Sequence, residues 1–93
     1  MKKKKNKDEV YEYRYKVGQN IAKIREQECG CTQADMEELT GISRAYYGRI
    51  ELGKHAATID VLLKIANALN VPVCRFFMDE NNVPISSKNI SDS

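Results

Sequence analysis

The sequence lacks any apolar run approaching the roughly 18 residues that a membrane-spanning helix needs. Its N-terminus is charged but is not followed by an apolar segment, so it does not resemble an export signal. Its 93 residues can form one modest hydrophobic core, with nothing left for a separate cofactor domain. We therefore expect a small cytoplasmic protein that does not contact membranes.

Cysteine and histidine are scarce. The three cysteines, Cys29, Cys31 and Cys74, are odd in number, and Cys31 and Cys74 lie among residues expected to form the core. We therefore expect reduced thiols, and two sulfurs with a distant third make a poor metal or redox site. His55 has no second histidine beside it, and no nucleophile–base pair is visible. The sequence predicts no enzyme activity, no cofactor and no metal.

Positive charge is concentrated at the N-terminus, where five lysines precede the first acidic residue: Lys2, Lys3, Lys4, Lys5 and Lys7. Residues 8–93 carry ten Lys and Arg against thirteen Asp and Glu, a net charge of −3. Overall charge therefore does not indicate nucleic-acid binding. We interpret residues 1–9 as a flexible basic arm, which serves either solubility or contact with phosphates.

The first predicted helix has an apolar face formed by Val10, Tyr13, Val17, Ile21 and Ile24. It begins between Asp8 and Val17, and Gly30 is suited to the left-handed conformation that follows a helix. Thr32 can then cap a second helix.

A helix-turn-helix pattern occupies residues 33–52. Met36, Leu39 and Thr40 recur at helical spacing in the second helix, and Gly41 follows where the chain must turn. Ile42 is an apolar plug, and Ser43 can cap a third helix over about 43–52. In this motif the second of the two helices often enters a DNA groove.

Thr58 is positioned to cap a fourth helix, and Pro72 to begin a short fifth one. The buried face of the fourth helix is expected to comprise Ile59, Leu62, Leu63, Ala66 and Leu69. Residues 81–93 are polar and predicted to be disordered. Five helices without a strand predict a compact all-α domain over residues 10–80.

A rotation of about 100° per residue gives the third helix two faces. Tyr47, Ile50 and Glu51 should point inward, and Ala45, Arg49 and Leu52 outward. An arginine can bond to guanine in the major groove, and an alanine methyl can contact that of thymine. We predict Arg44, Ala45 and Arg49 as base-reading residues.

Other residues are placed for contacts with the DNA backbone. Gln33 and Ser43 stand at helix N-termini, whose amides and dipole favour phosphate. The full set is Gln33, Ser43, Tyr46, Gly48, Lys54 and His55. Three of these have simpler explanations: Tyr46 could pack on the second helix, Gly48 could be a tolerated defect, and His55 a solvated loop residue.

The sequence resembles the Cro/C1-type, or lambda-repressor-like, helix-turn-helix domains of the XRE family. The resemblance rests on V-G-Q-N-I-A-K-I-R, T-Q-A-D-M-E-E-L-T-G-I-S-R-A-Y-Y-G-R-I-E-L-G-K, T-I-D-V-L-L-K-I-A-N-A-L-N-V and a closing F-F. It implies a five-helix fold, a homodimer on a pseudo-palindromic operator, and regulation of transcription. It also implies pairing of Arg25 with Glu51, and dimerisation through the last helix around Phe76 and Phe77. Glu37 departs from the family pattern, because a small residue usually allows the two helices to pack closely there.

The function predicted from these observations is a sequence-specific DNA-binding regulator, a repressor that acts by occupying its operator with the third helix in the major groove. The alternative is an antitoxin or protein-interaction module that uses the helix-turn-helix surface to bind a partner protein.

Overall fold

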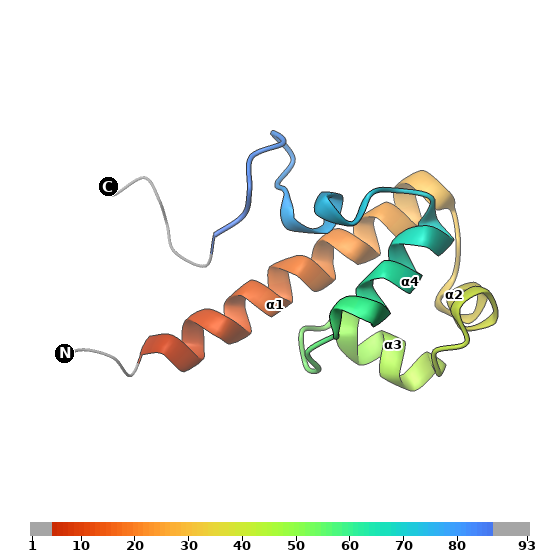
Figure 1. Ribbon diagram of the computed structural model, residues 1–93, viewed down its shortest axis with the longest axis horizontal. Helices are drawn as coiled ribbons and strands as arrows, with labels where there is room; N and C mark the ends of the chain where they lie inside the picture. Colours follow the sequence, from red (N-terminus) through yellow and green to blue (C-terminus); the bar gives the residue numbers. More distant parts are fainter. Residues whose placement is uncertain (1–4, 87–93) are drawn as a thin grey trace.

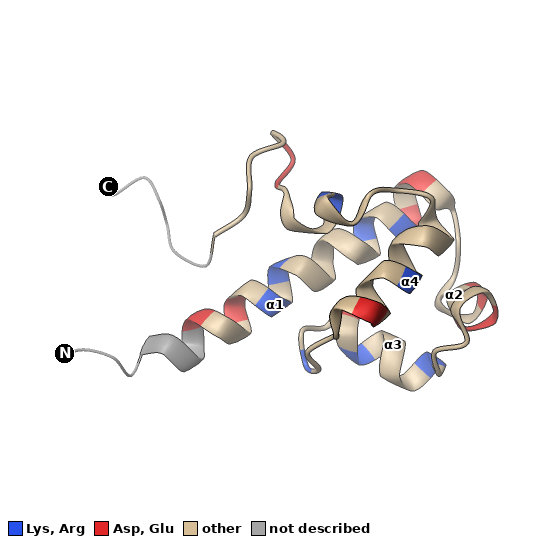
Figure 2. Cartoon of the chain, viewed as in Figure 1, with Lys and Arg blue, Asp and Glu red and all other residues tan. Residues whose placement is uncertain are grey.

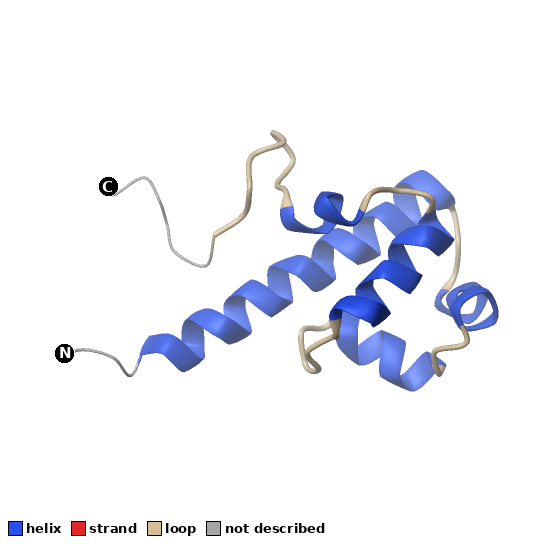
Figure 3. Cartoon of the chain, viewed as in Figure 1, coloured by secondary structure: helices blue, strands red, loops and turns tan. Residues whose placement is uncertain are grey.

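The computed structural model describes residues 5–86, with side chains from residue 9 onward. Four α-helices form the body, and they are α1 (Lys5–Lys23), α2 (Gln33–Thr40), α3 (Arg44–Glu51) and α4 (Ile59–Leu69) (Figures 1 and 3). The predicted all-α fold is confirmed. The expected fifth helix is a short 3-10 helix, Val73–Phe77, and α1 begins earlier than expected. Of the basic arm, residues 1–4 lie outside the described part.

The helix α1 is the long axis of the molecule, and the other helices gather around its C-terminal half (Figure 1). Its last turn widens into a π-helical segment, Ile24–Cys29. Gly30 ends this segment with a φ of 72°, and the carbonyl of Arg25 accepts hydrogen bonds from the amides of both Gly30 and Cys31. The chain therefore leaves the first helix in a tight turn that these two hydrogen bonds close.

Each of the next three helices begins at the predicted cap. The Thr32 hydroxyl accepts the Asp35 amide at 3.0 Å, and the Asp35 carboxylate accepts the Thr32 amide at 2.9 Å. Ser43 caps α3 and Thr58 caps α4, each accepting an amide three residues later at 3.2 Å. These side chains satisfy amides that a helix leaves without partners.

The core lies between the four α-helices and the 3-10 helix. Its buried apolar residues are Val17, Ile21, Ile24, Met36, Ile42, Tyr47, Ile50, Ile65, Ala66, Leu69 and Phe76. The predicted plug Ile42 is among them. Two residues assigned to the buried face of α4 are exposed instead, Ile59 at 73% and Leu63 at 43%. Helical spacing identifies which side of α4 faces the core, but the elements that pack against α4 do not cover the whole of that side.

The chain after α4 folds back onto α1. The Asn20 amide donates to the carbonyls of Phe76 and Met78, and the Lys16 ammonium donates to the carbonyl of Ser86. The Asp79 carboxylate accepts two amides of the turn that follows it. Residues 81–86, expected to be disordered, therefore form a hydrogen-bonded turn, whereas 87–93 lie outside the described residues.

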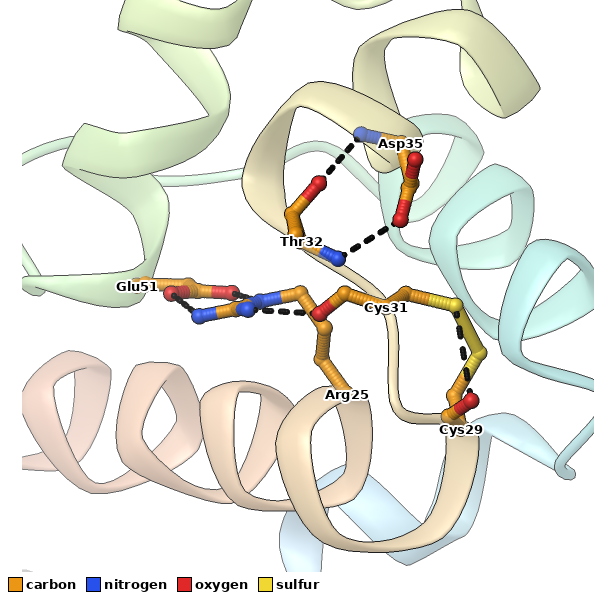
Figure 4. Close-up of a disulfide and its surroundings, with 6 residues drawn as sticks. All are labelled: Arg25, Cys29, Cys31, Thr32, Asp35 and Glu51. Atoms are coloured by element: carbon orange, nitrogen blue, oxygen red, sulfur yellow. Dashed lines mark hydrogen bonds and ion pairs between the residues drawn. A yellow bond between two sulfur atoms is a disulfide. The ribbon is translucent and has the colours of Figure 1, made fainter.

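The cysteines differ from expectation. Cys74 is exposed rather than part of the core, and Cys29 and Cys31 are joined by a disulfide instead of being reduced thiols (Figure 4). The left-handed turn at Gly30 brings their Cα atoms to 5.3 Å, within the range that a disulfide can bridge. Sequence spacing alone does not show such a turn.

None of the helices between residues 5 and 86 is both long enough and apolar enough to cross a bilayer.

Candidate nucleic-acid interface

The two predicted faces of α3 are present. Tyr47, Ile50 and Glu51 are buried, which fixes the rotation of the helix against α1 and the core. Ala45 and Arg49 are exposed on the opposite side, as is Leu52 just after the helix, and Arg44 is exposed in the first turn. An eight-residue helix is marginal in isolation, so this packing is what holds the outward side chains in place.

The outward side of α3 opens into a groove of about 740 Å³ between α1, α3 and the start of α2. From the predicted set, its lining brings together Gln33, Arg44, Ala45, Gly48 and Arg49. Ser43, Tyr46, Lys54 and His55 do not line it. Five of the nine predicted DNA-contacting residues therefore share one surface.

Three residues of α1 that were not predicted also line this groove, namely Ala22 and the pair Tyr15 and Gln19. The Gln19 amide donates to the Tyr15 hydroxyl at 3.1 Å, so the pair presents a connected polar edge. A signal for this pair exists in the sequence. They are four residues apart, on the side of α1 opposite to the apolar face, but nothing in the sequence shows that α3 lies beside them.

A buried ion pair fixes α3 to the end of the first helix. The Arg25 Nε atom lies 2.7 Å from Oε2 of Glu51, and Nη2 lies 3.0 Å from Oε1, while both residues are 7% exposed. The pairing implied by the family resemblance is therefore confirmed. The hydrogen bond to Glu51 raises the pKa of Arg25 above its ordinary value, although burial opposes this shift. A buried bidentate pair of this kind fixes geometry more than it adds stability.

Gln33 extends this network to α2. Its amide donates to Oε1 of Glu51 at 2.9 Å, so one carboxylate joins side chains from three helical segments. The Gln33 side chain also lies beside Gly48, where a Cβ would meet its Oε1 atom at 3.5 Å, an ordinary contact distance. Gly48 is therefore not required by packing inside the protein.

The remaining predicted residues lie at the two ends of α3. The Ser43 hydroxyl is used by its own helix as a cap. The half-buried ring of Tyr46, in the first turn, lies against His55 of the loop after α3, with ring centroids 5.3 Å apart, and Lys54 of that loop is exposed. The Lys54 amide donates to the Arg49 carbonyl at 2.8 Å, which ties the loop to the helix.

Charge is divided between the two helices of the motif. Basic residues mark α3 and the loop after it, whereas the charged residues of α2 are all acidic (Figure 2). These acids, Asp35, Glu37 and Glu38, are exposed. Glu37 therefore carries its carboxylate at the surface, and the adjacent Met36 fills the core.

A model of the helix-turn-helix family HTH_3 matches residues 21–76. The chain belongs to this helix-turn-helix family. The match covers the π-helical segment, α2, α3, α4 and most of the 3-10 helix, which is most of the region that resembles the Cro/C1-type domains, and this resemblance is confirmed.

Similar sequences are regulators. The chain is 31% identical over 72 residues to the HTH-type transcriptional regulator y4dJ of Sinorhizobium fredii, covering 77% of this chain and 92% of y4dJ. It is 38% identical over 56 residues to the HTH-type transcriptional regulator SutR of Escherichia coli, covering 60% of this chain but 31% of SutR. This member of the helix-turn-helix family is a DNA-binding transcription regulator.

Solved structures agree on the fold. The restriction-modification controller protein C.AhdI of Aeromonas hydrophila superposes with a TM-score of 0.64 at 30% identity, over 68% of this chain and 94% of C.AhdI. An HTH_3 family transcriptional regulator of Vibrio cholerae gives a TM-score of 0.67 at 29% identity, over 73% of this chain and 38% of that one.

Proposed function

We propose that this regulator is a repressor that inserts α3 into the major groove of a pseudo-palindromic operator. The observation that carries the proposal is the joint exposure of Arg44, Ala45 and Arg49 along one groove, while the opposite side of the same helix is buried. Occupancy of the operator by the domain blocks transcription. The family implies DNA as the ligand, and this surface is the part of α3 that is free to meet it.

The side chains on this surface suit base edges. Arg49 lies in the last turn of α3, where its guanidinium can form two hydrogen bonds with guanine O6 and N7. The Ala45 methyl, one turn earlier, can contact a thymine methyl, and Arg44 reaches a base from the first turn. We assign these three residues to base reading.

Backbone contacts would flank them. We assign the phosphate and sugar contacts to six residues: Gln33, Ser43, Tyr46, Gly48, Lys54 and His55. The absence of a side chain at Gly48 allows the sugar-phosphate chain to approach α3 closely, and Lys54 supplies a positive charge beyond its end. These contacts fix the register of the helix and carry no sequence information themselves.

A homodimer would bind two half-sites about 34 Å apart, one turn of DNA. The last helix is part of the proposed dimer surface, with one restriction: Phe76 is fully buried within its own protomer. The half-buried Phe77 is therefore the candidate contact. Sedimentation equilibrium of the wild type and of Phe77→Ser tests this surface, and unchanged dimerisation of the variant would exclude it.

The decisive experiment is selection of bound sequences from a random DNA library, followed by gel shifts at several salt concentrations. Arg49→Ala should lose preference for the selected operator by about 1–3 kcal/mol while retaining most nonspecific affinity. Lys64→Ala, which removes an exposed cation from α4, is the matched control. Unchanged operator preference in Arg49→Ala would contradict the assignment. Absence of any retarded DNA even at low salt would favour the alternative, in which the surface binds a partner protein as an antitoxin's would.

A further inference from the structure

The disulfide between Cys29 and Cys31 stands directly before the helix-turn-helix. Only one residue separates Cys31 from α2, and this residue, Thr32, is the cap of that helix. Cys31 is half-buried against the core, whereas Cys29 is exposed. Any change in the bond between the two sulfurs therefore acts on the segment that positions α2.

The main chain of Cys31 is held on both sides by Arg25. Its amide donates to the Arg25 carbonyl at 3.0 Å, and its carbonyl accepts from Arg25 Nη1 at 2.8 Å. The same guanidinium makes the two bonds to Glu51 of α3, and Figure 4 shows the sulfurs, the guanidinium and the carboxylate in one connected group. Glu51 in turn holds Gln33 at the start of α2.

This connection links the sulfur chemistry to the surface proposed for DNA. With the disulfide closed, Gly30 and Cys31 are confined to the conformation in which Arg25 reaches both the Cys31 carbonyl and Glu51. With the disulfide open, the link between the first helix and α2 gains conformational freedom, and part of it must be lost again when α2 and α3 dock on DNA.

The pair is suited to thiol–disulfide exchange. Cys29 is exposed, so a small thiolate can reach its sulfur. Within the part of the chain that the structure describes, no group of three His, Cys, Asp or Glu side chains is arranged to hold a metal ion. The chemistry available to the pair is therefore the exchange of two electrons between its sulfurs and a small thiol or disulfide.

We propose that Cys29 and Cys31 form a thiol–disulfide switch that sets the DNA affinity of α2 and α3, with the disulfide form binding more tightly. In the opening step, one thiolate of a small dithiol attacks the sulfur of Cys29 and forms a mixed disulfide, while the bond between Cys29 and Cys31 breaks and Cys31 leaves as a thiolate. The second thiolate of the dithiol then displaces the sulfur of Cys29. The reagent becomes a cyclic disulfide, the protein gains two electrons, and the protons lost by the reagent finish on Cys29 and Cys31. A small-molecule disulfide such as oxidised glutathione reverses the reaction.

This switch rests on the proposed function, because it requires α2 and α3 to contact DNA. Its test uses the full chain carrying Cys74→Ser, so that the exposed third cysteine does not take part in exchange. The protein is equilibrated with oxidised glutathione or with a dithiol reductant, and intact mass before and after thiol alkylation gives the fraction of each form. Affinity for the selected operator is then measured by gel shift.

We expect the disulfide form to predominate after oxidised glutathione and to bind about tenfold more tightly than the dithiol form, a coupling of about 1.4 kcal/mol. The variant Cys29→Ser, which changes an exposed side chain, should bind like the dithiol form under both conditions. Far-ultraviolet circular dichroism should show the same helix content in all three proteins.

The outcomes separate the two proposals. Equal operator affinity of the two redox forms would overturn the switch and leave the reading surface on α3 intact. Complete alkylation of both cysteines after oxidised glutathione would also overturn it, since no disulfide form would then exist. Failure of both forms to select any DNA sequence would overturn the proposed function together with the switch.

Discussion

Gly18 of α1 lies directly against the backbone carbonyl of Glu51 at the end of α3. A Cβ atom placed on Gly18 would also lie 2.5 Å from the carbonyl oxygen of Ile50, closer than side-chain carbons approach backbone. The absence of a side chain at this one position lets the two helices touch. It thereby sets how far α3 stands from α1.

Gly18→Ala should therefore destabilise the protein by about 1–3 kcal/mol, because the two backbones must separate. The gain of roughly 1 kcal/mol in helix propensity does not offset this. Urea denaturation followed by circular dichroism measures the change. A variant as stable as the wild type would show that the helices are not in backbone contact.

Gly48→Ala is the matched substitution on α3, and the opposite result is expected. A Cβ there meets only the Gln33 side chain at an ordinary distance, so helix propensity should raise the stability by about 0.5–1 kcal/mol. Affinity for the operator should nevertheless fall, since the added methyl meets the sugar-phosphate backbone. Denaturation and gel shifts on the same sample separate the two effects. Undiminished affinity would mean that no DNA backbone approaches this residue.

Glu51→Gln should destabilise the protein by about 3–5 kcal/mol, because the buried guanidinium of Arg25 loses its buried partner and keeps only the exposed Glu26 carboxylate, 3.3 Å from Nη2. The double variant Arg25→Met with Glu51→Leu should recover most of this loss, as apolar replacements of buried ion pairs do. Operator affinity of the double variant should be lower than that of the wild type, since the side-chain hydrogen bonds from Arg25 to Cys31 and from Gln33 to Glu51 are lost. A double-mutant cycle measures the coupling, and additive single effects would contradict it.

Tyr47→Phe should preserve or increase stability. The ring is fully buried, and among the described residues none offers its hydroxyl a hydrogen bond. An unsatisfied buried polar group lowers the stability of the folded state by about 1–3 kcal/mol, and phenylalanine at this position removes that group. Loss of stability by more than 1 kcal/mol in thermal melts would indicate a partner for the hydroxyl, for which a bound water is sufficient.

The same tyrosine predicts a response to alkaline pH. Burial raises the pKa of Tyr47 above its ordinary value of 10.0, and the neighbouring Glu51 carboxylate adds to the shift. The unfolded chain loses this proton near pH 10 while the folded chain keeps it, so the stability contribution is complete below pH 10 and falls above it. Unfolding free energies measured from pH 8 to 11 should decline less steeply in Tyr47→Phe. Parallel curves would contradict the shift.

Much of the fold could be read from the sequence because the signals are local. Serine and threonine caps act within three residues, and helical spacing correctly placed Tyr47, Ile50 and Glu51 inward. The outward position of Ala45 and Arg49 on α3 followed from the same rotation, whereas Arg44, which the rotation did not place there, also lines the groove. The contacts of these three with bases remain predictions.

Features that depend on contacts between distant segments were missed. Tyr15 and Gln19 join the groove only because α1 and α3 touch at Gly18. The return of the chain across α1, which the hydrogen bonds of the Asn20 amide secure, has no signal in the sequence. The disulfide depends on the backbone conformation of one glycine.

The hydrogen bonds of Asn20 have a practical consequence for anyone shortening this chain. The family match ends at residue 76, yet one acceptor of the Asn20 amide is the Met78 carbonyl, and Ile85 packs against the core while its amide bonds to Phe77. The unit that folds is thus longer than the unit that sequence comparison recognises. A fragment cut at the family boundary would lack these contacts, so domain swaps and fusions should keep residues 77–86.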